Sequence, residues 1–366
     1  MDIIPHATNN RIEYLDGHRG LAILLVVSFH AYSRWANFLP YKSGLETFPI
    51  FSYGWLGVEL FFLISGFVIL MTLEKCSTAS HFLFKRWLRL FPGMLLCSLI
   101  IFITAGYFFE RPAGPPEPIS LLPGLTFISD AWWERVLQFD IPLLEGSFWS
   151  IYVEFKFYIF AAIFYYWKGR KSLLYALFLV SIFSVFILLL NHITHQPTPS
   201  IISLFLRITS FEYFGWFLSG SLFYVFTQSK TNTDLALAIL AAVLASIVTS
   251  EMNLSIFFGA ITIAAIFTIS IISSFAQKIL QARFLLFFGA ISYPLYLLHQ
   301  NIIISSLVKL HRSLHWIPVI SLPLIPILLI SLVSYVVMKY GEPKIRYLIL
   351  KFSQTSIRSI FSRAEN

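Results

Sequence analysis

The sequence predicts an all-α integral membrane protein with about ten transmembrane helices. Of its 366 residues, 57% are hydrophobic and only 12% are charged, whereas an average soluble domain carries about 25% charged residues. The mean hydropathy is +0.77, and too few charges exist to cover the surface of a water-soluble globule. The composition also excludes a disordered or collagen-like chain, and only two cysteines, Cys76 and Cys97, argue against a disulfide scaffold.

Ten apolar stretches are long enough to be transmembrane helices, each of which needs about 20 residues to cross a hydrocarbon core. Charged and turn-forming residues separate them, as at 168–171 and 196–199. The predicted spans run approximately over residues 20–39, 53–73, 91–109, 147–167, 172–190, 203–226, 235–250, 255–275, 285–307 and 318–339.

The distribution of lysine and arginine orients these spans. With the N-terminus placed in the cytoplasm, the inside segments hold about three times as many of these residues as the outside segments. The bias predicts that both termini are cytoplasmic. It also accounts for the net charge of +8, so we expect the lipid bilayer as a partner and no nucleic acid.

The ten spans use roughly 200 residues, which leaves little room for anything but loops and tails. We expect one polytopic membrane domain over residues 1–342 and a cytoplasmic basic tail over residues 343–366. No fused soluble domain is expected. The oligomeric state is left open.

The first predicted span carries Arg19 and His30, eleven residues apart. Eleven residues of α-helix rise ~16.5 Å and return to within ~20° of the same face. Arg19 is therefore expected near the cytoplasmic end of the span and His30 near the midplane, with Asp16 close to the same stripe. A neutral imidazole tolerates burial and accepts a proton near neutral pH, which makes His30 a candidate general base. The alternative is a histidine that only hydrogen-bonds a neighbouring helix.

Three further spans carry polar or ionisable residues, and charged groups are costly within a membrane. The second span contains Glu59 and Ser65, for which the alternative is an interfacial carboxylate on a packing helix. The fourth and ninth spans each have a polar stripe at helical spacing. Hydrogen bonds between helices account equally well for their Ser and Tyr residues. The stripes are Ser147, Ser150, Glu154 and Tyr158 in the fourth span and Ser292, Tyr296 and His299 in the ninth.

A basic stretch precedes the third span. Lys85 and Arg89 are four residues apart and Arg86 and Arg89 are three apart, so their cations converge on one helical face. Guanidinium groups suit phosphate oxygens, which predicts a phosphate-binding site. The alternative is a topology signal or a contact with lipid headgroups.

Together these residues predict a polar cavity within the membrane and a phosphate-binding site at its cytoplasmic mouth. Such a cavity fits either transport or a transfer reaction fed by a phosphorylated cofactor. The sequence contains no GxxxxGK[ST], HExxH, GxSxG or CxxC motif. No metal site is expected.

Six stretches, in the same order along the chain, resemble the acyltransferase-3 family of bacterial integral membrane O-acyltransferases. Each stretch is weak alone, and the joint match is specific. They are YLDGHRGLAILLVVSFH (14–30), GVELFFLISGFVI (57–69), KRWLRLFP (85–92), FWSIYVEFKFY (148–158), ISYPLYLLH (291–299) and EPKIR (342–346). Two positions depart from the family pattern, His18 in place of a common leucine and Lys156 in place of a common glutamine.

The resemblance implies ten membrane helices and a cytosolic acyl-CoA donor, usually acetyl-CoA. The acyl group then passes to a hydroxyl of a surface or lipid-linked carbohydrate, such as O-antigen, and the location is the bacterial cytoplasmic (inner) membrane. Some members carry a fused extracytoplasmic hydrolase domain. Transfer is then expected either from this membrane domain alone or with a separate partner.

The resemblance also implies roles for individual residues. By match, His30 is the general base, Arg19 its companion, and Arg86 and Arg89 the donor-binding pair. Glu154 matches a family glutamate and is a third catalytic candidate, which orients or charge-balances His30 unless Glu59 does so. We expect Lys85 to help hold the CoA phosphates. The expected cavity or substrate residues are Glu59, Ser65, Ser147, Trp149, Ser150, Tyr158, Tyr296 and His299.

Two other functions compete with acyl transfer. One is a proton-coupled secondary transporter in which Glu154, His30 and His299 form a proton relay; it predicts repeat symmetry, and none is found in the sequence. The other is a non-catalytic membrane scaffold, which does not need an aligned Arg19–His30 stripe. The acceptor, the acyl chain and the oxyanion donor are left open.

Overall fold

The structure is a computed structural model that describes residues 12–35, 37–38, 44, 46–195, 200–314 and 316–352. Every regular element in these ranges is helical, which confirms the predicted all-α class. The longer helices are α1 (Glu13–Tyr32), α3 (Gly57–Leu73), α4 (Ala79–Thr104), α7 (Trp149–Thr194), α9 (Phe214–Ser229), α10 (Asn232–Ser250), α11 (Leu254–Ile272), α13 (Arg283–Ser313) and α14 (Leu324–Val336). The shorter elements are α2 (Pro49–Ser52), α5 (Leu121–Thr126), α6 (Asp130–Leu137), α8 (Ser200–Thr209), α12 (Ser274–Leu280), η1 (Gly54–Leu56), η2 (Pro118–Ser120), η3 (Gly146–Phe148), η4 (Phe211–Tyr213), η5 (Val319–Ser321) and the π-helical η6 (Val337–Gly341).

Within the described residues, six helices are long and apolar enough to cross a membrane, or eight if two bent pairs each count as one span. The bent pairs are α8 with the α9 segment, at 61°, and α12 with α13, at 66°. The protein is therefore an all-α membrane protein, and the count of ten spans stays a prediction. The side on which the termini lie also stays a prediction, because residues 1–11 and 353–366 fall outside the described ranges.

Several boundaries differ from the predicted spans. Helix α1 runs over residues 13–32 rather than 20–39, so that Asp16 and Arg19 are inside it. Helix α4 begins at residue 79 and includes the basic stretch, which was expected to precede the span. The predicted fourth and fifth spans both lie in α7, and the backbone leaves the helical region between them, at Lys168 and Gly169. The last helical segment continues to Phe352, into the predicted tail.

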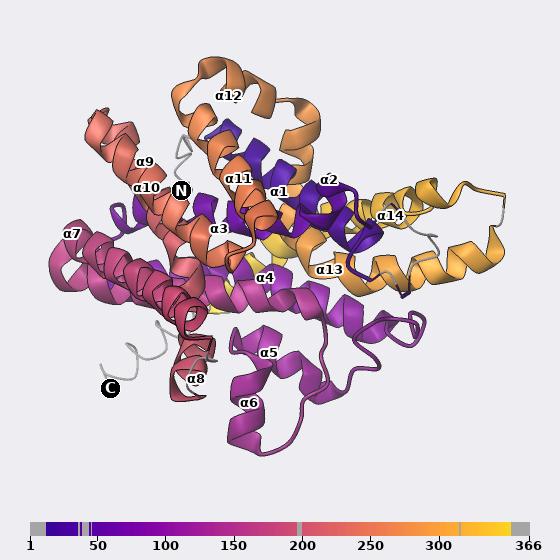
Figure 1. Cartoon of the computed structure of the whole chain (residues 1–366). Helices are drawn as coiled ribbons and strands as arrows, with labels where there is room; N and C mark the ends of the chain where they lie inside the picture. The colour runs from indigo at the N-terminus through magenta and orange to yellow at the C-terminus, as the bar shows by residue number, and fades with distance from the viewer. Residues whose placement is uncertain are drawn as a thin grey trace, which may run out of the picture.

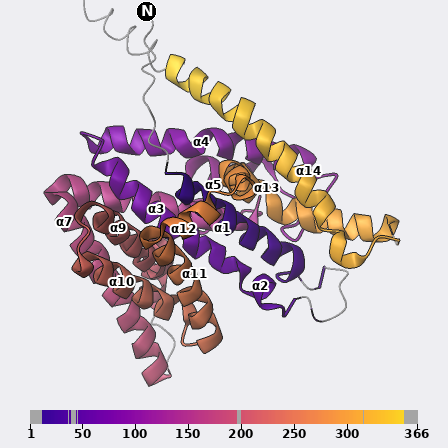
Figure 2. The same cartoon turned by 90° about the horizontal axis from the view of Figure 1, so that it is seen from above.

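The centre of the molecule is the packing of α1 against α13, the most extensive contact between two helices. Figure 2 shows this pair between α4 and α14 on one side and α9 to α11 on the other. Two glycines permit the approach: a Cβ on Gly20 would lie 2.1 Å from the Leu285 carbonyl oxygen, and one on Gly289 would lie 2.0 Å from that of Asp16. Small residues at such crossings let helix backbones meet within a membrane.

A second glycine-mediated contact joins α3 to α9. A Cβ on Gly66 would lie 2.2 Å from the Phe217 carbonyl oxygen, and one on Gly220 would lie 1.9 Å from that of Leu63. Figure 1 shows how α3 lies beside α1 and how α4 and α7 run alongside this group of helices. The helices α1, α3, α4, α7 and α13 line the arginine cavity described below.

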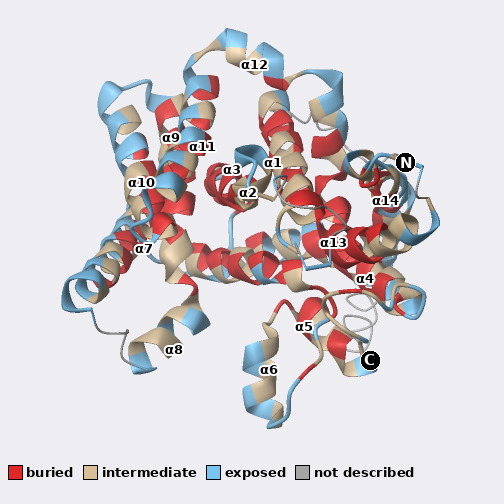
Figure 3. Ribbon diagram, turned by 45° about the vertical axis from the view of Figure 1, so that its right-hand side comes forward, coloured by how far each residue is buried: buried red, intermediate tan, exposed pale blue. Residues whose placement is uncertain are grey.

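Helices α6 and α8 stand apart from this core. Neither has a buried residue, and both are tan and pale blue in Figure 3, whereas α1, α3 and α13 are largely red. Helix α6 belongs to the long connection between α4 and α7, where Trp132 and Phe139 are exposed.

Candidate active site

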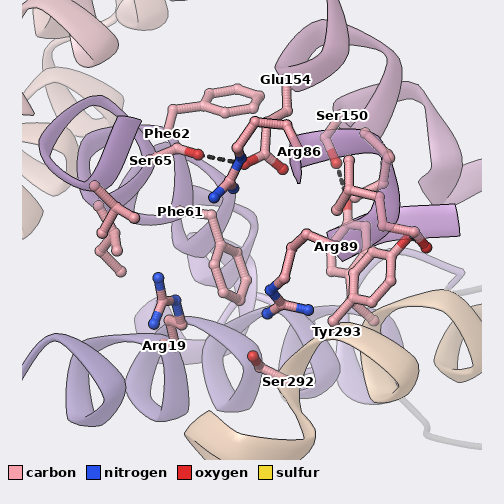
Figure 4. A pocket seen from close by; sticks show the side chains of 15 residues that line it. Arg19, Phe61, Phe62, Ser65, Arg86, Arg89, Ser150, Glu154, Ser292 and Tyr293 are labelled. Atoms are coloured by element: carbon pink, nitrogen blue, oxygen red, sulfur yellow. Dashed lines mark hydrogen bonds between the residues drawn. The ribbon is translucent and has the colours of Figure 1, made fainter. Parts of the chain in front are cut away.

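The first functional cavity is built around three arginines and is called here the arginine cavity. Its volume is about 180 Å³. Arg19 comes from α1, and Arg86 and Arg89 come from one face of α4, so the predicted convergence of these cations holds in three dimensions. Figure 4 shows their guanidinium groups pointing into the same space. The remaining lining residues are Phe61, Phe62, Ile64, Ser65, Val68, Leu90, Ser150, Ile151, Glu154, Ser292, Tyr293 and Tyr296.

Each of the three arginines is held by a neighbouring side chain. The Nη1 atom of Arg19 lies 2.7 Å from the Asp16 carboxylate, one turn earlier on α1. Arg86 donates a hydrogen bond of 2.8 Å to the Tyr158 hydroxyl and lies over the Tyr158 ring. Arg89 lies over the ring of Tyr293, with its guanidinium carbon 5.7 Å from the ring centre. These contacts orient three positive charges around one small space, which is an arrangement suited to an anion.

Among the described residues, Glu154 is the single carboxylate that lines the arginine cavity. Its Oε1 atom accepts a hydrogen bond of 2.5 Å from Tyr158 and another from Ser65. Because Tyr158 also accepts from Arg86, the carboxylate is part of a continuous network between α3, α4 and α7. Of the predicted stripe, Ser150 and Glu154 therefore line this cavity, and Tyr158 is hydrogen-bonded to Glu154 without lining it.

The second cavity contains His30 and is called here the histidine cavity. Its volume is about 530 Å³. Of the predicted cavity residues, Ser147, Trp149 and Tyr296 line it beside His30. The other lining residues are Val26, Phe29, Arg34, Trp35, Trp55, Val58, Pro112, Ala113, Leu143, Gly146 and Gln300.

His30 is hydrogen-bonded to His299 of α13. The Nε2 atom of His299 lies 3.1 Å from Nδ1 of His30, and the two rings meet edge to face. The Nδ1 atom of His30 also lies 3.0 Å from the Val26 carbonyl oxygen, and Nδ1 of His299 lies 2.7 Å from that of Tyr296. Since a carbonyl oxygen only accepts, both Nδ1 atoms carry hydrogen. His299 Nε2 is then an acceptor, and the lone pair of neutral His30 is on Nε2.

Tyr296 lines both cavities and lies between them. Its hydroxyl donates to the Ser147 carbonyl oxygen at 3.0 Å and shares a hydrogen bond of 2.6 Å with the Ser150 hydroxyl. Ser150 lines the arginine cavity and Ser147 the histidine cavity, so these three residues form the boundary between the two spaces. Arg19 and His30 mark the two sides of that boundary on α1, separated by ~16.5 Å of helix rise.

Four predicted site residues line neither cavity: Tyr158 and His299, which are hydrogen-bonded to Glu154 and His30, and Lys85 and Glu59. Lys85 is exposed and does not line the arginine cavity. Glu59 is buried but lines a third cavity, described below. The side chain that hydrogen-bonds His30 is that of His299, and a role of Glu154 or Glu59 in orienting or charge-balancing His30 stays a prediction.

Sequence reasoning missed several lining residues. Arg34 lies one helical turn after His30, and that spacing was a usable signal. Gln300 directly follows His299, and Tyr293 adjoins Ser292. Trp55 precedes α3 and had no periodic pattern to identify it. These residues join the cavities through packing between helices that are distant in sequence.

The connection between α4 and α7 is fixed to α13 beside the histidine cavity. The side-chain oxygen of Asn301 accepts a hydrogen bond of 3.2 Å from the backbone amide of Ala113. The backbone amide of Asn301 donates one of 3.3 Å to the Glu145 carboxylate. Arg111 is buried and donates to the Leu144 carbonyl oxygen. Burial raises the pKa of Glu145 to about 8, against the opposing effect of the nearby Arg111. Both ends of the connection are thus held at one point of the bundle.

Comparison with known proteins decides the family. A family described as an acyltransferase domain matches residues 12–338. The chain belongs to the acyltransferase-3 family. Within the residues that the structure describes, no group of three His, Cys, Asp or Glu side chains is placed to hold a metal ion. No solved structure matches the chain.

Curated relatives carry related names. The peptidoglycan O-acetyltransferase OatA of Listeria monocytogenes is 26% identical over 79% of this chain and 49% of its own length. The O-acetyltransferase OatA of Staphylococcus aureus (strain NCTC 8325 / PS 47) is 25% identical over 91% of this chain and 57% of its own length. An O-acetyl transferase of Shigella phage Sf6 is 26% identical over 40% of this chain and 44% of its own length. The chain thus spans about half the length of the curated relatives that it matches.

Proposed function

We propose that this chain is a membrane O-acetyltransferase that moves an acetyl group from acetyl-CoA to a carbohydrate hydroxyl. The observation that carries the proposal is the meeting of two cavities at Tyr296, one lined by three arginines and the other by His30, which is hydrogen-bonded to His299. The family and the names of its relatives support the reaction class. The multi-pass fold supports a membrane location, for which we propose the bacterial inner membrane.

The arginine cavity is the proposed donor site. CoA carries several phosphate groups, and charge-assisted hydrogen bonds between guanidinium groups and phosphates are about twice as strong as neutral ones. Arg86 and Arg89 bind these phosphates at the mouth of the cavity, with Lys85 on the exposed face nearby. Arg19 lies deeper, toward the thioester end of the donor. This assignment is supported by the convergence of the three guanidinium groups in Figure 4.

The histidine cavity is the proposed acceptor site. The aromatic side chains of Trp35, Trp55 and Trp149 line it, and flat rings pack against the C–H faces of sugars. Its volume, about 530 Å³, exceeds that of the arginine cavity. A carbohydrate acceptor agrees with the name of the Listeria relative, a peptidoglycan O-acetyltransferase.

His30 is the proposed general base. Its Nε2 atom removes the proton from the acceptor hydroxyl, and the oxygen attacks the thioester carbonyl. The carbon–sulfur bond then breaks, and the CoA sulfur leaves with the proton that His30 returns to it. General base catalysis of this kind contributes about 10²–10⁴ in rate. His299 holds the Nδ1 hydrogen of His30 and so keeps the lone pair on Nε2.

Tyr296 is the proposed crossing point for the acetyl group. Its hydrogen bonds to Ser147 and Ser150 close the boundary between the cavities in this structure. The thioester and the acceptor hydroxyl must meet there, so these bonds open or rearrange when the donor is bound. Glu154 acts on the donor side, where it fixes Tyr158 and Arg86, rather than on His30.

The transporter alternative receives less support from the same geometry. A relay through Glu154, His30 and His299 needs continuous hydrogen bonds, and only the two histidines are joined. Glu154 is bonded instead to Ser65 and Tyr158 on the other side of Tyr296.

The test uses the purified chain in lipid vesicles with labelled acetyl-CoA and extracted surface glycan. We expect label to move to the glycan, and we expect His30→Ala to stop it while leaving acetyl-CoA binding in place. Mass spectrometry of surface glycans from cells with and without the protein would identify the acceptor. Transfer by His30→Ala at the wild-type rate would contradict the base assignment, and acetyl-CoA-independent proton-coupled solute movement would favour the transporter.

A further inference from the structure

A third cavity lies beside the histidine cavity and is used by no step above. We call it the glutamate cavity. Its volume is about 640 Å³, and its walls come from η1 and α3, the end of α7, the α8–η4 bend and the end of α10. The lining residues on which the argument depends are Trp55, Glu59, Arg207, Glu212, Tyr213 and Glu251.

Two carboxylate oxygens of side chains that line this cavity have no hydrogen-bond partner within the part of the chain that the structure describes. Glu59 is 2% exposed, and its Oε2 atom has no hydrogen-bond partner. The Oε2 atom of Glu212 is likewise buried without one. Lys156, whose charge acts on Glu212, is engaged elsewhere, since its Nζ atom donates to the Ser210 hydroxyl at 2.9 Å and to the Arg207 carbonyl oxygen at 3.2 Å. Buried acceptors left unsatisfied destabilise a protein, so they indicate a ligand that donates hydrogen bonds.

The glutamate cavity adjoins the proposed acceptor site through aromatic side chains. Trp55 lines both cavities. Tyr213 lines the glutamate cavity and packs against Trp149, which lines the histidine cavity, with ring centres 5.2 Å apart. A ligand long enough to occupy both spaces would pass along these rings.

The residues that line the glutamate cavity favour one class of hydrogen-bond-donating ligand over the others. Arg207 and His192 face the same space as the carboxylates, which disfavours a purely cationic ligand. Within the described residues no metal-binding group is present, which disfavours a divalent cation. A sugar ring fits better, because its hydroxyls donate to carboxylates and its C–H faces pack on Trp55 and Tyr213.

We infer that the glutamate cavity holds a second sugar of the acceptor, next to the sugar that is acetylated in the histidine cavity. The inference rests on the proposed function, since it needs a carbohydrate acceptor beside His30. It adds a substrate property: the enzyme recognises a glycan of at least two units, with Glu59 and Glu212 as hydrogen-bond acceptors.

The experiment compares acceptors of different length. One-, two- and three-sugar fragments are prepared from the glycan whose acetylation depends on the protein, and KM is measured with the full chain in lipid vesicles. For Glu59→Gln and Glu212→Gln we expect KM to rise for the two-sugar fragment about tenfold more than for the one-sugar fragment, as the loss of one hydrogen bond predicts. The control Asp140→Asn removes an exposed carboxylate of the α6–η3 connection and should change neither value.

Equal changes in KM for short and long fragments would overturn the second-sugar site while leaving the acetyltransferase in place. No transfer to any fragment by the unaltered chain would overturn the proposed function itself. If Glu59→Gln does not fold, Glu251→Gln at the exposed edge of the same cavity gives the same comparison. If Glu251→Gln then changed KM equally for one-sugar and two-sugar fragments, the inference would be contradicted.

Discussion

His30 and His299 share a hydrogen bond of 3.1 Å although 269 positions separate them in sequence. The contact exists because α1 and α13 cross closely, and it converts two isolated membrane histidines into an oriented pair. Tyr296, one turn before His299, uses its carbonyl oxygen to fix the second ring. The pair therefore depends on packing as much as on its own chemistry.

Replacement of His299 should lower the rate without weakening donor binding. In His299→Leu the Nδ1 hydrogen of His30 loses its second acceptor, so the ring is no longer held in one orientation. We expect kcat to fall by about 10- to 100-fold. This is the range seen when the hydrogen-bond partner that orients a metal-ligating histidine is removed. The KM for acetyl-CoA should not change. His81→Ala, at an exposed position on α4, is the matched control, and a rise in donor KM for His299→Leu would contradict the orienting role.

Neutralising the cavity arginines should act on the donor. Arg86→Gln and Arg89→Gln each remove a charge that lines the arginine cavity. We expect each to raise the KM for acetyl-CoA by about 10- to 150-fold, because a charge-assisted hydrogen bond contributes about 1.5–3 kcal/mol and each 1.4 kcal/mol is a factor of ten. Lys85→Gln should have a smaller effect, since that side chain does not line the cavity. The measurement is steady-state transfer with varied donor, and equal effects of Lys85→Gln and Arg89→Gln would place the phosphates elsewhere.

Widening the α1–α13 crossing should separate the two histidines. The Cβ atom of Gly289→Ala would meet the Asp16 carbonyl oxygen at 2.0 Å, so the helices must shift, at a cost of about 1–3 kcal/mol. We expect a lower thermal unfolding temperature and a loss of transfer. Gly106→Ala is the control, because nothing lies within 4 Å of its Cβ position. Full activity of Gly289→Ala would show that the crossing tolerates the added atom.

The stability of the protein should fall at alkaline pH because of Glu145. Burial raises its pKa from the ordinary value of 4.5 to about 8, so the folded protein holds a proton that the unfolded chain releases. This favours folding most fully below about pH 4.5, and the benefit declines as pH rises and is lost above about pH 8. We expect thermal unfolding of the unaltered protein in detergent to shift downward between about pH 6 and pH 9 more than that of Glu145→Gln. Parallel curves for the two proteins would rule out Glu145 as the titrating group.

Local spacing was enough to predict individual helical faces. The i, i+4 relation of Glu154 and Tyr158 was realised as a hydrogen bond, and the three- and four-residue spacings of the basic stretch brought Arg86 and Arg89 to one cavity. Such relations follow from the helical period alone. Lys85 shares the stretch but points to solvent, because the path of α4 past its neighbours decides which part of the basic face is covered.

Span boundaries were predicted less well than faces. Hydropathy placed the start of the first span after Arg19, although the helix begins at Glu13, since charged residues lower hydropathy without ending a helix. For the same reason hydropathy placed the start of the third span after the basic stretch at residues 85–89, which is in fact part of α4. The break at Lys168 and Gly169 was located correctly as a turn, where a glycine with φ of 74° permits the change of direction.

The sequence by itself determined the membrane class, the helical faces and the residue types of the site, because composition and helical periodicity are local properties. Only the tertiary structure decided that His299 rather than a carboxylate contacts His30, that Tyr296 divides two cavities, and that Glu59 belongs to a third. These relations depend on which helices touch and at what depth. That choice is made by close packing at glycines such as Gly20 and Gly289, whose partners lie far away along the chain.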